Sequence, residues 1–210
     1  MKKTVVYIGP SIADEPPEKY FKDHVEFRPP IKRGDLLELD ESVERVAIVD
    51  GVFHNSLAVS IREIRALINT GVEIIGSSSM GALRAAELYN HGMTGIGKVF
   101  ELYRDGIVDS DADVALIFDS KTFRNITIPR ISFKSLLNDM KVEGLISNDE
   151  MKACFTIVDS IHYMELTRSG MLKKLQNFPK VHAFIQANES LLDVKKADAI
   201  KLADYLLASN

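Results

Sequence analysis

The chain has 210 residues, of which 46% are hydrophobic and 27% are charged, as in an ordinary globular protein with a full core. Its formal net charge of −4 argues against a general nucleic-acid-binding surface, and no apolar run approaches the length of a membrane span. The N-terminal segment is too short for a signal peptide, so we expect a cytoplasmic protein. The single cysteine, Cys154, excludes an internal disulfide and a cysteine-rich metal site, and its amphipathic surroundings predict a buried thiol.

Predicted strands and helices alternate over the first ninety residues. Runs of β-branched and other apolar residues predict four strands, at residues 4–9, 24–27, 45–50 and 72–75. Apolar residues at helical spacing predict a helix over 58–69, which Gly71 ends, and an Ala- and Leu-rich run predicts another over 82–89. This alternation indicates the α/β class, with a mostly parallel sheet and helices on both faces.

The segment after residue 90 leads from this sheet into a helical region. Its pattern predicts a glycine-rich connection at 90–97, a helix at 98–105 and an acidic turn at 106–113. Two extended pieces are predicted to follow, at 114–118 and 123–131. The acidic turn, with Asp109, Asp111 and Asp113, lacks the glycine and the terminal glutamate of a calcium-binding loop. We therefore expect a solvated turn there and no metal site.

The C-terminal third of the chain is helical by pattern. Ser147 and Glu150 have the spacing of a capping box ahead of an amphipathic stretch that reaches Leu166. Two more helices are predicted, at 172–188 and 191–207. We predict an α/β core at 1–130, followed by a helical C-terminal extension at 131–210 that packs on the core.

A serine-rich loop joins the fourth predicted strand to the next helix: Gly76-Ser77-Ser78-Ser79-Met80-Gly81, called the Ser loop from here on. A loop of small residues before a helix can present backbone N–H groups and hydroxyls to an anion. It can also raise one serine as a nucleophile beside an oxyanion hole, or be only a tight turn. The loop lacks the lysine of a P-loop, which disfavours a nucleoside triphosphatase. The three interpretations stay open at this point.

Ser79 is the candidate nucleophile, because Gly81 follows it by two residues, as in a nucleophile elbow. The N–H group of Met80 is then the natural oxyanion donor. Ser77 and Ser78 are candidate ligands of a bound anion. Arg84, about one turn into the helix, could hold a carboxylate or phosphate there, or could form only a surface ion pair with Glu87.

The candidate general base is His54, because it follows the end of the third predicted strand at the same edge of the sheet. Asp50 could orient His54 or only cap the turn. The N–H groups of Gly51 and Val52 could complete an oxyanion hole. His91, just after the helix that follows the Ser loop, is the second candidate base.

Three segments together resemble the TfuA-like core domain. They are Val-Asp-Gly-Val-Phe-His at 49–54, Gly-Ser-Ser-Ser-Met-Gly-Ala-Leu-Arg-Ala-Ala-Glu-Leu at 76–88 and Gly-Met-Thr-Gly-Ile-Gly-Lys-Val-Phe-Glu-Leu-Tyr-Arg-Asp-Gly at 92–106. Gly9-Pro10-Ser11 and Arg33-Gly34-Asp35 fit the N-terminal part of that domain. The resemblance covers roughly residues 4–120 and leaves the helical remainder unmatched.

This resemblance implies an accessory role in thioamidation. TfuA-like proteins act with YcaO proteins, which activate a backbone amide with ATP, on ribosomal peptide natural products or on the thioglycine of methyl-coenzyme M reductase. The resemblance thus implies a protein that supplies sulfur to YcaO or activates it, with a peptide or protein as the final substrate. No cofactor is expected, and the oligomeric state is left open.

Two functions remain as alternatives. The first is a serine-type hydrolase that releases sulfide from a thiocarboxylated ubiquitin-like carrier, which suits the Ser loop because a thiocarboxylate is both an anion and an acyl group. The second is a non-catalytic partner that docks on YcaO and orders its active site. A free-standing esterase or peptidase is disfavoured.

Overall fold

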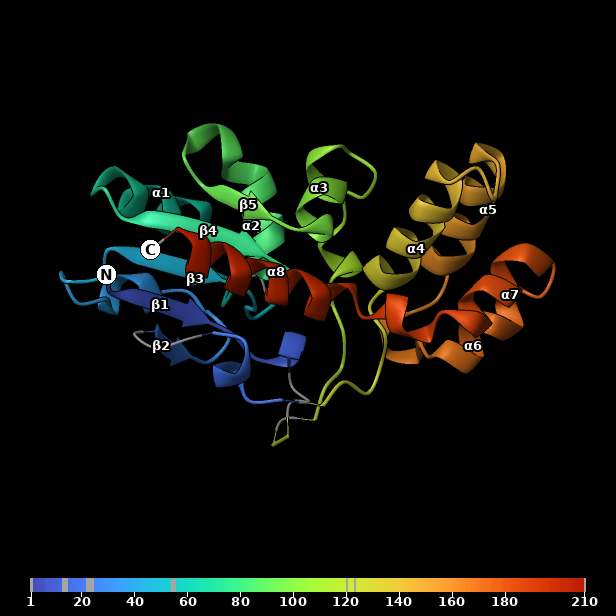
Figure 1. Cartoon of the computed structure of the whole chain (residues 1–210), viewed down its shortest axis with the longest axis horizontal. Coiled ribbons are helices and arrows are strands. Elements are labelled where there is room, and N and C mark those ends of the chain that lie inside the picture. The colour runs from blue at the N-terminus through green and yellow to red at the C-terminus, as the bar shows by residue number, and fades with distance from the viewer. Residues whose placement is uncertain are drawn as a thin grey trace. The chain divides into compact units, whose positions relative to one another are not determined.

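The computed structural model describes residues 2–12, 15–21, 25–53, 56–119, 121–122 and 124–209. The chain divides into two compact units: a sheet unit, Met1–Asp109 with Lys195–Asn210, and a helical unit, Ser110–Val194. The sheet unit therefore combines the blue-to-green part of the ribbon with the red C-terminal helix (Figure 1). These bounds differ from those of the predicted domains, 1–130 and 131–210, whose existence as separate folding units stays a prediction.

The sheet unit contains a five-stranded, fully parallel sheet with the strand order β2-β1-β3-β4-β5. The strands are β1 (Thr4–Tyr7), β2 (Val25–Arg28), β3 (Arg45–Ile48), β4 (Glu73–Ser77) and β5 (Thr94–Ile96). The predicted α/β class and the parallel sheet are confirmed. The chain steps from β1 to one side for β2 and to the other side for β3, so the strand order reverses between β1 and β3. Parallel sheets bind ligands beyond the carboxyl ends of the strands at such a switch point.

One face of the sheet is covered by the C-terminal helix α8 (Val194–Ala208). Val6, Ala47 and Ile75 are aligned across β1, β3 and β4, and they belong to one apolar cluster with Ala199 and Leu202 of α8. The alanines of α8 are small enough to let the helix approach the strands closely. A helix from the end of the sequence thus completes a sheet formed by the first half.

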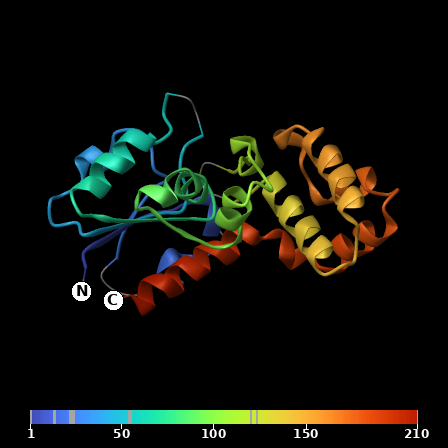
Figure 2. The ribbon, with the colours of Figure 1, turned by 90° about the horizontal axis from the view of Figure 1, so that it is seen from above.

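The other helices of the sheet unit are α1 (Ile61–Asn69), α2 (Met80–Leu88) and α3 (Lys98–Arg104). Figure 2 shows α1 and α2 on the opposite face of the sheet from α8. A capping box of Ser60 and Glu63 starts α1, and Gly71, with φ +91°, follows its end as the sequence predicts.

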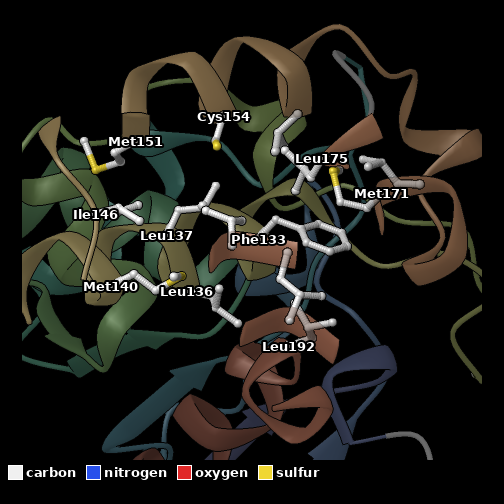
Figure 3. Close-up of a cluster of buried hydrophobic side chains, with 14 residues drawn as sticks. Phe133, Leu136, Leu137, Met140, Ile146, Met151, Cys154, Met171, Leu175 and Leu192 are labelled. Carbon is white, nitrogen blue, oxygen red and sulfur yellow. The ribbon is translucent and has the colours of Figure 1, made fainter. Parts of the chain in front are cut away.

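The helical unit contains α4 (Arg130–Val142), α5 (Asn148–Asp159), α6 (Arg168–Lys174) and α7 (Pro179–Ala187). Its apolar core is drawn in Figure 3, where side chains from these helices point toward one another. Cys154 of α5 is fully buried in that core, as the sequence predicts, and the capping box of Ser147 and Glu150 is present. None of the described helices has the length and apolar character needed to cross a membrane.

Several details of the second half differ from the sequence predictions. The predicted helix over 172–188 is interrupted, because α6 ends at Lys174 and α7 begins at Pro179. The glycine-rich connection contains β5, and the predicted strand at 114–118 reduces to an isolated bridge between Phe118 and Asn125. The predicted helix over 147–166 ends at Asp159. The acidic turn is only partly solvated, because Asp113 is fully buried with Lys134 Nζ 2.9 Å from its carboxylate. Burial raises the pKa of the Asp113 carboxyl, and the Lys134 ammonium opposes that rise.

The strand β4 and the helix α2 approach so closely that only glycine fits between them. A Cβ atom on Gly76 would lie 2.0 Å from the carbonyl oxygen of Gly81, and one on Gly81 would lie 1.7 Å from that of Ile48. Both clashes are with backbone, which cannot rotate away. The two glycines that flank the Ser loop are therefore requirements of the fold.

We predict that Gly81→Ala lowers the free energy of unfolding by about 3 kcal/mol or more, because the new methyl group collides with the β3 backbone. Gly71→Ala is the matched control. It has open space around it but a positive φ, so it should cost only about 1 kcal/mol. Urea unfolding of the two variants measures both values. Equal losses would contradict the close approach of α2 to β3.

We predict that the Cys154 thiol is unreactive in the folded protein, because burial raises its pKa from 9.0 to about 11. The buried neutral thiol favours the folded state fully below about pH 9, and this contribution is lost as the pH rises through about 11. Alkylation by iodoacetamide at pH 8, followed by mass spectrometry, should be at least about a hundredfold slower in buffer than in denaturing urea. A native rate close to the unfolded rate would contradict this burial.

Candidate active site

The carboxylate of Asp50 joins the ends of β1 and β3 at the switch point of the sheet. Its Oδ2 accepts hydrogen bonds from the N–H groups of Gly9 (2.9 Å) and Ser11 (3.0 Å), and its Oδ1 accepts one from the Ser11 hydroxyl (2.7 Å). Asp50 is only 2% exposed, so these bonds replace the water that the charge would otherwise need. The ends of β1 and β3 are therefore brought into contact.

Ser78 links the third strand end to this pair. Its hydroxyl lies 2.8 Å from Ser11 Oγ and 2.9 Å from the carbonyl oxygen of Lys195 in α8. Ser78 also has a φ of +66°, and it is the one non-glycine residue with a positive φ among those that the structure describes. Such a left-handed backbone conformation costs about 1–3 kcal/mol in a residue other than glycine, and it persists only where the surrounding structure holds it. The contacts to Ser11 and Lys195 hold it here.

Ser77 is tied to α8 in the same way. Its hydroxyl lies 2.8 Å from the carbonyl oxygen of Ile96 in β5 and 3.0 Å from that of Asp198 in α8. Ser77 and Ser78 are both fully buried. In the structure their hydroxyls hold the first turn of α8 over the Ser loop, and their predicted role as ligands of an anion stays a prediction.

The side chain of Asp198 extends this contact to α3. Its two carboxylate oxygens accept hydrogen bonds from the N–H groups of Lys98 (2.8 Å) and Val99 (2.7 Å) at the start of α3. Burial raises the pKa of this carboxyl, and the N–H groups of Val99 and Lys98 oppose the rise because they stabilise its charged form. A Cβ on Gly97 would lie 2.3 Å from Asp198 Cγ, so only glycine admits the carboxylate here.

Ser79 differs from its two neighbours. Its hydroxyl has no hydrogen-bond partner among the described residues, although the residue is only 2% exposed. Its own N–H donates to the carbonyl oxygens of Ser77 (2.8 Å) and Val49 (3.3 Å). Of the three serines in the loop, Ser79 is thus the one whose hydroxyl the fold does not use.

The three predicted oxyanion donors, Met80, Gly51 and Val52, differ in whether their N–H groups already have an acceptor, and their role stays a prediction. Within the described part of the chain, neither Met80 nor Gly51 donates its N–H group to an acceptor. The two residues pack together, since a Cβ on Gly51 would lie 2.7 Å from Met80 Cγ. The N–H of Val52, by contrast, donates to the carbonyl oxygen of Ile31 (2.9 Å) and is already occupied.

The guanidinium group of Arg84 is already hydrogen-bonded and ion-paired within the protein. Its Nε donates to the carbonyl oxygen of Val59 (3.0 Å), and its Nη1 pairs with Glu87 (2.6 Å). The alternative interpretation of Arg84, an ion pair with Glu87, is therefore present in the structure. A role for Arg84 toward a bound anion stays a prediction.

The structure bears differently on the two candidate general bases, His54 and His91. His54 lies outside the described residues, so its role as the base stays a prediction. His91 follows the C-terminal end of α2, whereas Ser79 precedes its N-terminal end, and nine helical residues span about 13 Å. His91 is exposed and is excluded as the base for Ser79 in this structure.

A family model described as TfuA-like protein matches residues 50–167, which is more than half of the chain. The chain belongs to the TfuA-like family. No curated protein matches it. The match begins at Asp50, includes the Ser loop and extends through α5 of the helical unit, beyond the end near residue 120 that the resemblance suggested.

Three residues that organise the Ser loop of this TfuA-like protein lie outside the matched region. Ser11 precedes it, and Lys195 and Asp198 follow it. The sequence placed Ser11 only in a segment that fits the N-terminal part of the TfuA-like domain, and it gave no sign of the other two. Lys195 and Asp198 contact the serines through backbone carbonyls, which every residue has, so no sequence signal could have found them.

We predict that Asp50→Ala lowers the free energy of unfolding by about 3 kcal/mol, because two N–H groups and one hydroxyl lose their buried acceptor. Asp40→Ala is the matched control. Asp40 also accepts hydrogen bonds from a neighbouring serine, Ser42, but its side chain is 65% exposed. The control should cost less than about 1 kcal/mol in the same urea titration. Similar losses in both variants would show that Asp50 does not hold the strand ends together.

Proposed function

We propose that this TfuA-like protein supplies sulfur for backbone thioamidation by a YcaO partner, and that it does so by hydrolysing a thiocarboxylated carrier at the Ser loop. The family's association with thioamidation supports the process. The observation that carries the hydrolytic step is the hydroxyl of Ser79 at the start of α2, which has no hydrogen-bond partner among the described residues. The N–H groups of Met80 and Gly51 likewise have no acceptor there.

The reaction follows from the chemistry of a thiocarboxylate. Ser79 Oγ attacks the carbonyl carbon while the base, proposed to be His54, takes the serine proton. The oxyanion that forms is stabilised by the N–H groups of Met80 and Gly51. The base passes the serine proton to sulfur as the carbon–sulfur bond breaks, and hydrosulfide leaves. Water then hydrolyses the seryl ester to free the carrier's carboxylate. Each turnover consumes one water and needs no oxidant or reductant.

Burial of the Ser loop supports a second candidate function. Ser77, Ser78 and Ser79 are 0%, 0% and 2% exposed, and two of their hydroxyls hold the fold together. A loop used only in this way suits a non-catalytic protein that docks on YcaO and activates it. The peptide or protein substrate would then be bound by YcaO alone.

Sulfide release from a thiocarboxylate-terminated carrier protein, without YcaO present, tests the proposal. The expected result is steady release by the unmodified protein and a loss of up to about six orders of magnitude in Ser79→Ala, because a nucleophile and its base act as a unit. His54→Ala should show a comparable loss. A residue that only binds the anion would cost about tenfold to a hundredfold.

Ser169→Ala is the matched control, since Ser169 is an exposed serine in the first turn of α6. It should release sulfide at the unmodified rate. No release by the unmodified protein, together with normal stimulation of YcaO by Ser79→Ala when sulfide is supplied, would reject the hydrolase and establish the docking activator.

A further inference from the structure

The Ser loop is closed by a segment that no motif of the sequence connects with it. The first turn of α8, residues 195–198, contributes the carbonyl oxygens of Lys195 and Asp198 to the hydroxyls of Ser78 and Ser77. These residues belong to the sheet unit, so the contact is internal to one compact body. Ser77 and Ser78, which contact this turn, are fully buried, and the neighbouring Ser79 is 2% exposed. An acyl group could not reach Ser79 in this arrangement.

We propose that residues 195–198 form a gate, which closes the Ser loop in the structure described here and opens before a substrate reaches Ser79. The gate is held by several contacts, which include the ion pair of Lys196 Nζ with Glu15 Oε1 at 3.8 Å and the buried Lys195. Two serine hydroxyls hold its backbone from below, and the Asp198 carboxylate holds it from the side through the N–H groups of Lys98 and Val99. All of these bonds break together if the turn unwinds, while the rest of α8 keeps its apolar contact with the sheet.

The remainder of α8 is anchored independently of the gate. Ala199, Leu202, Ala203 and Leu206 belong to the apolar cluster on the sheet. At the far end, the carbonyl oxygen of Ser209 accepts a hydrogen bond from the buried Arg45 side chain (3.0 Å). The first turn can therefore open without releasing the helix.

The position of the gate in the chain offers a route for control. Val194 is the last residue of the helical unit, and the next residue, Lys195, is the first of the gate. A force on the helical unit thus reaches the gate through a single peptide bond. This gives the helical unit a means of regulating the Ser loop without contributing a side chain to it.

Access to residue 79 can be measured directly, because the one native thiol is buried. Ser79→Cys places a reporter thiol in the loop, and Cys154 in the core of the helical unit serves as the internal reference for unfolding. Alkylation of both thiols by iodoacetamide is followed by mass spectrometry, and each native rate is divided by the rate of the same thiol in urea. We expect the reporter thiol to be less protected than Cys154.

Asp198→Ala removes the side contact of the gate. It should speed alkylation of the reporter thiol by at least about tenfold, the effect of losing hydrogen bonds to a charged group, and leave the protection of Cys154 unchanged. Asp204→Ala is the matched control, because it removes the same charge from an exposed position on the same helix and should change neither rate. Equal protection of both thiols in the Ser79→Cys protein would overturn the gate, and so would parallel acceleration of both by Asp198→Ala.

The effect of the gate on sulfide release rests on the proposed function, whereas the labelling does not. With Ser79 intact, Asp198→Ala should raise basal release of sulfide, while a merely structural contact would leave release unchanged or lower it. If no protein releases sulfide but the reporter thiol responds to Asp198→Ala, the hydrolase fails and the gate stands. If release occurs but the thiols show equal protection, the hydrolase stands and the gate fails.

Discussion

The buried carboxylate of Asp50 is the interaction on which the rest of the site depends. It lies where the strand order reverses, and its hydrogen bonds to Gly9 and Ser11 join the ends of β1 and β3. Ser11 passes the connection on to Ser78, which is held in a left-handed conformation beyond the end of β4. Three strand ends are thus positioned by one charge. A buried charge is stable only with such a set of donors, which explains why the contacts are so complete.

The three serines of the loop have different roles because of this arrangement. The strained backbone at Ser78 turns the chain between strand and helix, and the two glycines let the elements approach without a side chain between them. Ser77 and Ser78 direct their hydroxyls at α8, so they act as structural donors. The hydroxyl of Ser79, at the start of α2, has no hydrogen-bond partner in the part of the chain that the structure describes. The same geometry that buries the loop therefore leaves Ser79 as the serine on which the proposed hydrolysis rests.

The helix α8 packs on the sheet, so the sheet unit contains both the first half of the chain and its last helix. Its pattern suggested part of a C-terminal extension, whereas its small and apolar residues complete the core of the sheet unit. The helical unit is therefore inserted between the first half of the sheet unit and its last helix. An inserted unit is connected to the sheet unit at both ends, and one of those connections leads directly into the turn over the Ser loop. The chain thus passes between the two units at residues 109–110 and 194–195.

The sequence by itself determined the alternation of strands and helices, the parallel sheet, the serine-rich turn at a strand end and the family. Apolar runs and helix caps act locally, so β1 to β4 and the capping box of α5 could be predicted. The strand β5 was missed because Gly95 is a poor strand former, and only the fold shows that the Phe100 ring occupies the space of its absent side chain. The tertiary structure alone decided which hydroxyls are engaged. Ser78 and Lys195 are 117 positions apart, and the bond ends on a backbone carbonyl that carries no mark in the sequence.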